Sequence, residues 1–268
     1  MKKHINWNLR IGAVITGVLV LLILIGCVWT PYDPNAMSSA DKQLGPCLAH
    51  IFGTDNFGRD MFSRVLEGGR TSLLIAFSTV LIGVSIGIVV GSLTGYFGGW
   101  LDELLMRLSD SIAAFPSMLL ALVVVSVFGA GKYKIILTLG ILFIPSFSRI
   151  VRGEFAKERT KDYVENARIM GAGPFRVMFA HILPNVQNVL LSAMAIGFNN
   201  AVLAEASMSY LSMGVQPPDA SLGRMLSEAQ GTMFTTPWCA VFTGGFIVLL
   251  ILGVSLLGQG LQEKEVHK

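Results

Sequence analysis

Residues 163–184 read YVENARIMGAGPFRVMFAHILP, a polar and basic stretch that lies between long apolar segments. The pattern predicts two short helices. The first begins near Lys161 and stops at Gly171, because glycine readily adopts the left-handed conformation that ends many helices. The second has Pro174 near its first position and ends before Pro184, because a proline lacks the N–H group that would continue the helix. A structured pair of helices between membrane spans predicts a surface that binds a cytosolic protein.

The composition is that of a membrane protein. Apolar residues make up 53% of the 268 residues, charged residues make up 14%, and the mean hydropathy is +0.63. A soluble domain carries about 25% charged residues. The sequence therefore predicts an all-α, polytopic membrane helix bundle that uses nearly the whole chain. This composition predicts the lipid bilayer as a partner. The net charge is only +3, and the charges follow the topology without forming a patch, so no nucleic-acid partner is expected.

About six transmembrane helices are predicted from runs without charged residues, since roughly 20 apolar residues cross a bilayer. The fourth run is short and must extend through Val151. The fifth is the least apolar, because Gln187, Asn188, Asn199 and Asn200 interrupt it. The six expected spans cover residues 11–28, 71–97, 111–131 (beginning nearer Leu104), 135–148, 186–204 and 240–257.

The lysines and arginines determine the expected orientation. Placing the N-terminus inside puts most of them in the cytoplasm, including the cluster between Arg149 and Arg176. No small-residue cleavage site follows the long first apolar run, which favours an uncleaved anchor over a secretory signal. The expected segments are a cytoplasmic N-terminus with the first transmembrane helix at 1–30, an extracytoplasmic loop at 31–70, a core at 71–260 with a cytoplasmic loop at 157–185, and a cytoplasmic tail at 261–268.

Four glycines in the second span recur every fourth residue, at Gly83, Gly87, Gly91 and Gly95. This spacing places them on one helix face, where a neighbouring helix can approach until the backbones touch. Tight helix packing is the favoured interpretation. A sliding surface for a transporter that changes shape is compatible with it.

The same span contains Gly83-Val84-Ser85-Ile86-Gly87, which matches the G-x-S-x-G pattern of hydrolases. That motif requires a strand, a sharp turn and a helix, with acid and histidine partners. Here it lies within a continuous apolar helix, so an intramembrane enzyme that depends on Ser85 is a remote alternative. The sequence also contains neither a phosphate-binding loop nor an H-E-x-x-H zinc motif.

Ionisable residues are nearly absent from the expected spans, which argues against an ion-coupled, stand-alone carrier. Arg107 and Asp110 are spaced to form an ion pair on one helix face. Glu205 lies at the outer end of the fifth span, where we expect it to face water or a substrate path. In the outer loop, Asp55 and Arg59 (with Asp60) are expected to form local turn and salt-bridge contacts.

The cysteines and histidines are too scattered to predict a metal site. His50 is expected to be an ordinary surface histidine. Cys47 and Cys239 both fall on the expected outer side, so a disulfide between them is left open, whereas Cys27 is expected to pack within the first span.

The quoted stretch resembles a family motif. The pattern E-A-A, three residues, G, nine residues, H-x-L-P is matched at Glu165, Ala167, Gly171, His181, Leu183 and Pro184. Asn166 departs from it, where alanine is usual. This motif marks the permease subunits of ABC-type importers, whose loop docks into a cleft of a separate ATPase.

The resemblance extends over most of the chain and narrows to the smaller permease of dipeptide, oligopeptide and nickel importers. Departures lie near the C-terminus, where residues 221–223 read SLG in place of SWG and residues 258–262 read GQGLQ in place of GDGLR. The matching stretches are PYDPN at 31–35, GTDNFGRD at 53–60, GYFGGW at 95–100, LMR at 105–107, Asp110, AFP at 114–116, Arg149, VRG at 151–153, EAS at 205–207 and GVQPP at 214–218.

This resemblance implies a type I ABC importer permease in a bacterial plasma membrane, with both termini in the cytoplasm. Its implied partners are a second homologous permease, two ATPase subunits that bind ATP and Mg, and an extracytoplasmic binding protein; the chain itself is expected to hold no cofactor and to be no enzyme. The ATPase-coupling residues would be Glu165, Ala167, Arg168, Gly171, His181 and Pro184. Short peptides are the favoured substrate over nickel or a metal chelate, because the spans contain no cluster of metal-binding side chains.

Overall fold

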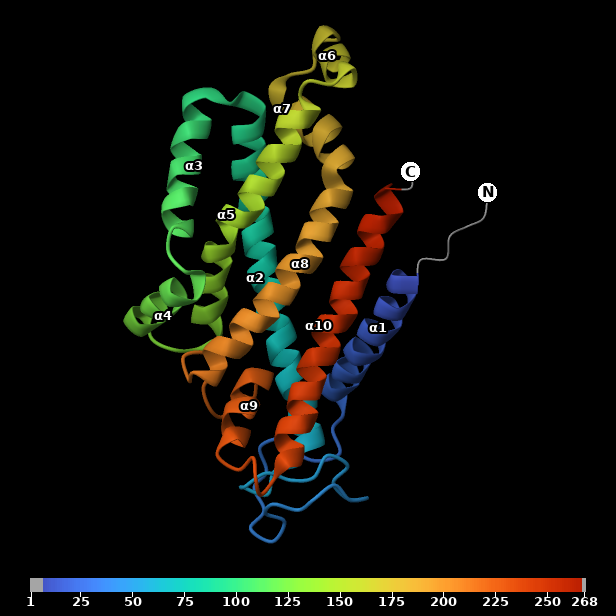
Figure 1. Ribbon diagram of the computed structural model, residues 1–268, viewed down its shortest axis with the longest axis vertical. Helices are drawn as coiled ribbons and strands as arrows, with labels where there is room; N and C mark the ends of the chain where they lie inside the picture. The colour runs from blue at the N-terminus through green and yellow to red at the C-terminus, as the bar shows by residue number, and fades with distance from the viewer. Residues whose placement is uncertain (1–6, 267–268) are drawn as a thin grey trace.

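The computed structural model describes residues 7–266, and the parts of the expected cytoplasmic ends at 1–6 and 267–268 lie outside this range. All the regular elements of the described chain are helices, and the β-type pairing in it is an isolated bridge between Thr54 and Asp60, which confirms the all-α prediction. Most of the long helices run roughly along the long axis of the molecule (Figure 1). The elements are α1 Trp7–Val28, α2 Met61–Phe97, α3 Gly99–Ala113, α4 Ser117–Phe128, α5 Lys132–Glu158, α6 Asp162–Ile169, α7 Pro174–Arg176, the π-helical η1 Val177–Ile182, α8 Leu183–Tyr210, α9 Leu222–Gln230 and α10 Pro237–Val266.

Five helical segments of the described chain are long and apolar enough to cross a membrane, and a sixth is broken. The five are α1, α2, α5, the segment Pro174–Tyr210 and α10. The third span expected at 111–131 is not one continuous helix, because α3 and α4 meet there at 83° and form a span only as a bent pair. The break coincides with Pro116, which disfavours helical conformation at the preceding Phe115 and cannot donate a backbone hydrogen bond.

The expected stop before Pro184 is also wrong, because the helix that begins at Pro174 continues through η1 into α8. The π-helical turn makes this possible. The N–H of Leu183 donates to the carbonyl oxygen of Met178, five residues earlier, so the hydrogen-bond register shifts just before the proline. Pro184 then lies in the first turn of α8, where its missing N–H group is tolerated.

Helices α2 and α5 form the central pair, and the four-residue glycine repeat lies between them. A Cβ atom on Gly87 would come within 2.6 Å of the Phe147 Cβ, and one on Gly91 would come within 2.6 Å of the Ser148 carbonyl oxygen. Real Cβ atoms do not approach other atoms so closely, so only glycine permits this separation. Gly83 and Gly95 meet the same helix, at residues 143 and 155, so the two helices run parallel and in register.

A second glycine-mediated contact, between α1 and α10, was not predicted. A Cβ on Gly12 would lie 2.5 Å from the Leu257 backbone nitrogen, and one on Gly253 would lie 2.6 Å from the Thr16 hydroxyl oxygen. These glycines do not recur with a regular spacing, so the sequence alone does not mark a packing face on α1 or α10 as the four-residue repeat does on α2. The contact attaches α1 to the side of the bundle through α10 (Figure 1).

Glu205 is buried and does not face water, contrary to expectation. Its carboxylate accepts hydrogen bonds of 2.7 Å from the hydroxyl groups of Ser72 and Ser209. The Ser72 hydroxyl oxygen in turn accepts a hydrogen bond of 3.2 Å from the N–H of Leu222, at the start of α9. A buried carboxyl group needs such partners, and they tie together α2, α8 and α9.

The expected pair between Arg107 and Asp110 is wrong as well. Arg107 pairs with Glu103 on its own helix, whereas Asp110 reaches across to Arg149 of α5 at 2.8 Å. Arg107 could pair with Glu103, four residues before it, or with Asp110, three residues after it, because both spacings allow an ion pair on a helix. Asp110 pairs with Arg149 instead because α5 packs beside α3.

The glycine contacts predict a measurable packing effect. We expect Gly91→Ala to lower the free energy of unfolding of the detergent-purified protein by about 1–3 kcal/mol, the usual effect of overpacking. Gly153→Ala is the matched control, because no atom lies within 4 Å of a Cβ at that position of α5. Thermal unfolding followed by circular dichroism measures both. Equal stability of the two variants would contradict the close approach of α2 and α5.

Candidate functional site

Residues 162–182 fold into a compact hairpin of α6, a glycine turn, α7 and η1. Gly171 makes the turn with a φ of +83°, and its N–H donates to the Arg168 carbonyl oxygen at 2.9 Å. The inner side of the hairpin is apolar and packs on the end of α5, through Val164, Ala167, Val177, Met178 and Ile182 against Val151 and Phe155. The hairpin is therefore a packed extension of α5 and α8 at one end of the bundle (Figure 1).

The tip of the hairpin exposes three large apolar side chains that sequence reasoning missed. Ile169, Met170 and Phe175 are 77%, 87% and 63% exposed. Such a group on a polar hairpin is typical of a protein-binding surface. The sequence does contain a signal for these exposed side chains. Met170 and Phe175 lie on either side of the glycine turn, where neither side chain can reach the core.

The structure brings some of the predicted coupling residues together and separates others. Glu165 and Arg168 lie exposed on α6 and border an open depression of about 520 Å³, close to the exposed Gly171. Ala167 points inward instead and is buried. His181 is half-buried in η1 and Pro184 is exposed at the start of α8, so both belong to the stalk of the hairpin.

Polar contacts attach the hairpin to the C-terminal ends of α2 and α5. Arg168 lies over the Tyr96 ring, 5.0 Å from its centroid, and donates to the Tyr96 hydroxyl oxygen at 3.2 Å. Arg159 donates to the Tyr96 carbonyl oxygen at 3.2 Å. The Tyr163 hydroxyl group donates to Glu158 at 2.7 Å, and burial together with this hydrogen bond raises the pKa of Tyr163 to about 12. A force on the hairpin therefore acts directly on both central helices.

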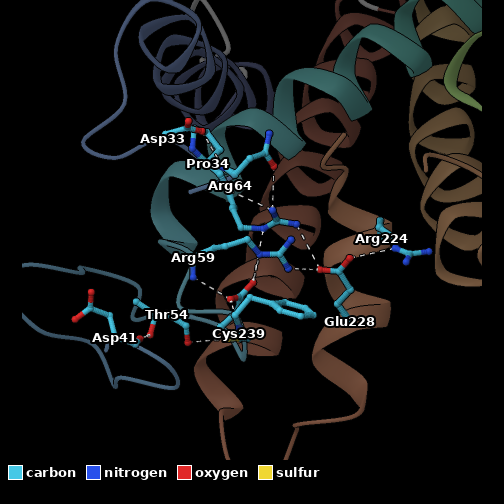
Figure 2. Close-up of polar contacts among 12 residues, drawn as sticks. Asp33, Pro34, Asp41, Thr54, Arg59, Arg64, Arg224, Glu228 and Cys239 are labelled. Atoms are coloured by element: carbon cyan, nitrogen blue, oxygen red, sulfur yellow. Dashed lines mark hydrogen bonds and ion pairs between the residues drawn. The ribbon is translucent and has the colours of Figure 1, made fainter. Parts of the chain in front are cut away.

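A second polar cluster lies at the opposite end of the bundle, where Arg59 and Arg64 converge on Glu228 of α9 (Figure 2). Arg59 donates to Glu228 at 2.8 Å and to Asp55 at 2.6 Å. The Arg64 side chain is 2% exposed and donates to the Pro34 carbonyl oxygen at 3.2 Å. The local pair of Asp55 and Arg59 is as expected, whereas the link to Glu228, distant in sequence, was not foreseen.

His50 belongs to this outer region and is buried, so the expectation of a surface histidine is wrong. Its Nδ1 lies 2.9 Å from an oxygen of Asp60, which also caps α2 by accepting from the Ser63 N–H at 2.8 Å. Cys47 and Cys239 are both free, so the open possibility of a disulfide is not realised. Within residues 7–266, no group of three or more histidine, cysteine and acidic side chains could hold a metal ion.

The described chain is thus a bundle of apolar helices long enough to span a membrane, with a packed hairpin at one end and a braced loop at the other. Comparison with known proteins gives the family. Residues 87–268 match the family described as binding-protein-dependent transport system inner membrane component, and the chain belongs to this family.

Curated relatives match over nearly their whole lengths. The chain is 38% identical to the glutathione transport system permease protein GsiD of Pectobacterium atrosepticum, over 94% of this chain and 85% of that protein. It is 35% identical to the dipeptide transport system permease protein DppC of Haemophilus influenzae, over 96% and 90% of the two chains. The chain is thus a permease subunit of an ABC importer and a multi-pass membrane protein.

A solved structure confirms the architecture. The fold is similar to that of a chain in inward-facing structures of the MetNI methionine ABC transporter, with a TM-score of 0.60 and 18% identity. The match covers 75% of this chain and 97% of that one. The expected type I ABC importer permease fold is therefore confirmed.

The outer cluster predicts a local effect on the loop that precedes α2. Glu228→Gln removes one of the two carboxylates that Arg59 and Arg64 share, the other being Asp55, which we expect to cost about 2 kcal/mol locally. Since each step of about 1.4 kcal/mol is a tenfold change in an equilibrium, limited proteolysis in membranes should cleave residues 29–60 about 30-fold faster. Glu67→Gln is the control, because its pair with Arg70 is 3.8 Å long and half-exposed. Equal cleavage in both variants would contradict a bracing role for Glu228.

Proposed function

We propose that this chain forms half of the translocation pathway of an ATP-driven importer of short peptides, and that residues 157–185 couple it to a separate ATPase. The observation that carries the proposal is the hairpin. It is fixed to α2 and α5, continues into α8, and presents exposed apolar side chains to a partner. The peptide assignment is supported by the relatives named for dipeptide and glutathione transport.

In this proposal the ATPase subunits bind ATP and Mg, and this chain supplies no cofactor. Closure of the ATPases moves the hairpin, with Glu165 and Arg168 as polar contacts and Ile169 and Met170 as apolar contacts. The movement swings α5 and α8 between inward-open and outward-open arrangements, a hinged domain closure. Gly171 provides the turn that gives the hairpin its shape.

The remaining proposed partners are a second homologous permease, a second ATPase subunit and an extracytoplasmic binding protein that docks on the outer loops. The proposed location is a bacterial plasma membrane with both termini in the cytoplasm. The positions of the helix ends support this orientation, since the start of α1 and the end of α10 point toward the end of the bundle that carries α6 (Figure 1). The outer loop and α9 lie at the other end.

The alternative functions are less well supported. Nickel import would gain support from metal-binding side chains, and the described residues contain no cluster of three. An intramembrane enzyme would need Ser85 in a sheltered site with acid and histidine partners. Ser85 lies instead on the exposed surface of α2, among the apolar side chains of Ile86 and Val89.

The coupling proposal predicts that Gly171→Val abolishes ATP-dependent uptake of a labelled dipeptide while the protein still reaches the membrane. Valine is strained at a φ of +83° by about 1–2 kcal/mol, so the turn changes shape. Gly173→Val is the matched control, because its φ is −66° and both glycines have open space around them. Normal dipeptide uptake by the Gly171→Val variant would contradict the proposed coupling role.

The transport proposal also predicts that Ser85→Ala leaves dipeptide uptake within about twofold of the parent chain, since surface substitutions change stability little. Uptake in whole cells measures this, with membrane abundance as the reference. A complete loss of activity with normal abundance would restore the enzyme alternative.

A further inference from the structure

Helix α5 carries an arginine at a depth where lipid does not tolerate one. A span needs roughly 20 residues to cross the hydrocarbon core, and the charge-free run at 135–148 is shorter. By length and composition, Arg149 therefore lies within the membrane-spanning part of α5, at its end nearest the hairpin, and not in the cytoplasm as the charge count placed it. Charged side chains at such positions almost always face a protein interior or a water-filled cavity.

The surroundings of Arg149 distinguish these two possibilities. Its partner is Asp110 of α3 at 2.8 Å, and the two side chains remain 49% and 63% exposed. Further inward, Arg152 forms a two-pronged pair with Asp102 at 2.5 and 2.6 Å. The short Asp110 side chain cannot extend to the membrane surface as a long arginine does, so a pair left exposed by this chain requires either water or a polar surface of another subunit.

A cavity continues this polar face toward the middle of the bundle. It has a volume of about 370 Å³ and lies between α4, α5 and α8. Its polar lining consists of Ser117, Ser146, Asn200 and Ser207. Ser146 precedes Arg149 by three residues, so both lie on the same face of α5. A stripe of polar groups therefore runs from the cavity toward the end of α5 that carries the hairpin.

The neighbouring helix provides the contrast at the same depth. Since α2 and α5 are parallel and in register, Ile86 lies level with Ser146, and Val89 lies level with Arg149. Ile86 and Val89 are 42% and 49% exposed. An exposed apolar face on α2 suits lipid, whereas the face of α3 and α5 at the same level is ionic.

We infer that the face formed by Ser146, Arg149 and Asp110 lines a water-filled passage in the inner half of the membrane, through which a charged or zwitterionic solute leaves the cavity. The identification of that solute as a peptide rests on the proposed function. The passage itself rests on the depth, exposure and pairing of these side chains. Paired charges of both signs keep the face hydrated without a net charge that would repel either end of a zwitterion.

Cysteine accessibility tests this passage directly. In a chain with Cys27, Cys47 and Cys239 replaced by serine, single cysteines are introduced as Ser146→Cys and Arg149→Cys. The depth-matched controls are Ile86→Cys and Val89→Cys. Inside-out membrane vesicles containing the assembled transporter, without ATP, are treated with a cationic, membrane-impermeant methanethiosulfonate. We expect the two α5 cysteines to react at least tenfold faster than their α2 controls.

Ser146→Cys keeps the result decisive if Arg149→Cys fails to fold, because it changes a single atom and breaks no ion pair. A Ser146→Cys that reacts as slowly as Ile86→Cys would overturn the passage, even if the same variant still imports dipeptide in whole cells. Rapid reaction at Ser146→Cys without dipeptide uptake by the parent chain would support the passage and contradict the peptide proposal. The two failures are thus distinguishable.

Discussion

The close approach of α2 and α5 is the constraint on which the rest of the molecule depends. Gly87 and Gly91 let the two backbones touch along the second half of α2, so the pair behaves as one rigid unit. Its inner end carries the hairpin through Tyr96 and Phe155, and its outer end carries Arg64. The same pairing also turns the ionic side of α5 away from the apolar side of α2.

Two acidic side chains, the buried Glu205 and the partly exposed Glu228, connect this unit to the helices around it. Glu205 ties α8 and the start of α9 to Ser72 of α2, and Glu228 ties α9 to the loop before α2. Both sets of contacts involve α9, which lies at the opposite end of the bundle from the hairpin (Figure 1). Since unpaired buried charges are costly, the outer contacts favour movement of whole helices over local loosening. Displacement of the hairpin would therefore reach the outer surface through α2, α5 and α8 together.

Local patterns predicted the helical class, five of the spans, the glycine face and the turn at Gly171, because each depends on residues close in sequence. The predictions from local patterns were wrong where the conformation or the contact depends on residues that are distant in sequence. The π-helical turn before Pro184 shifts a hydrogen-bond register, and the bend at Phe115 turns an apolar run into two short helices. The two helix starts of the hairpin, near Lys161 and at Pro174, agree with the structure. Its exposed tip was missed, although Met170 and Phe175 lie on either side of the glycine turn. The partners of Asp110, Glu205 and His50 likewise follow from packing between helices, which spacing along one helix does not reveal.

The chain combines a hairpin suited to a cytosolic partner, a braced outer loop and a polar stripe inside the membrane. These features fit a subunit that passes a hydrophilic solute while another protein supplies the energy. The most direct test is ATP-dependent uptake of a labelled short peptide and of labelled nickel, measured side by side in cells that lack this chain and in cells that regain it. The account predicts that the chain restores peptide uptake alone. Restoration of nickel uptake without peptide uptake would contradict it.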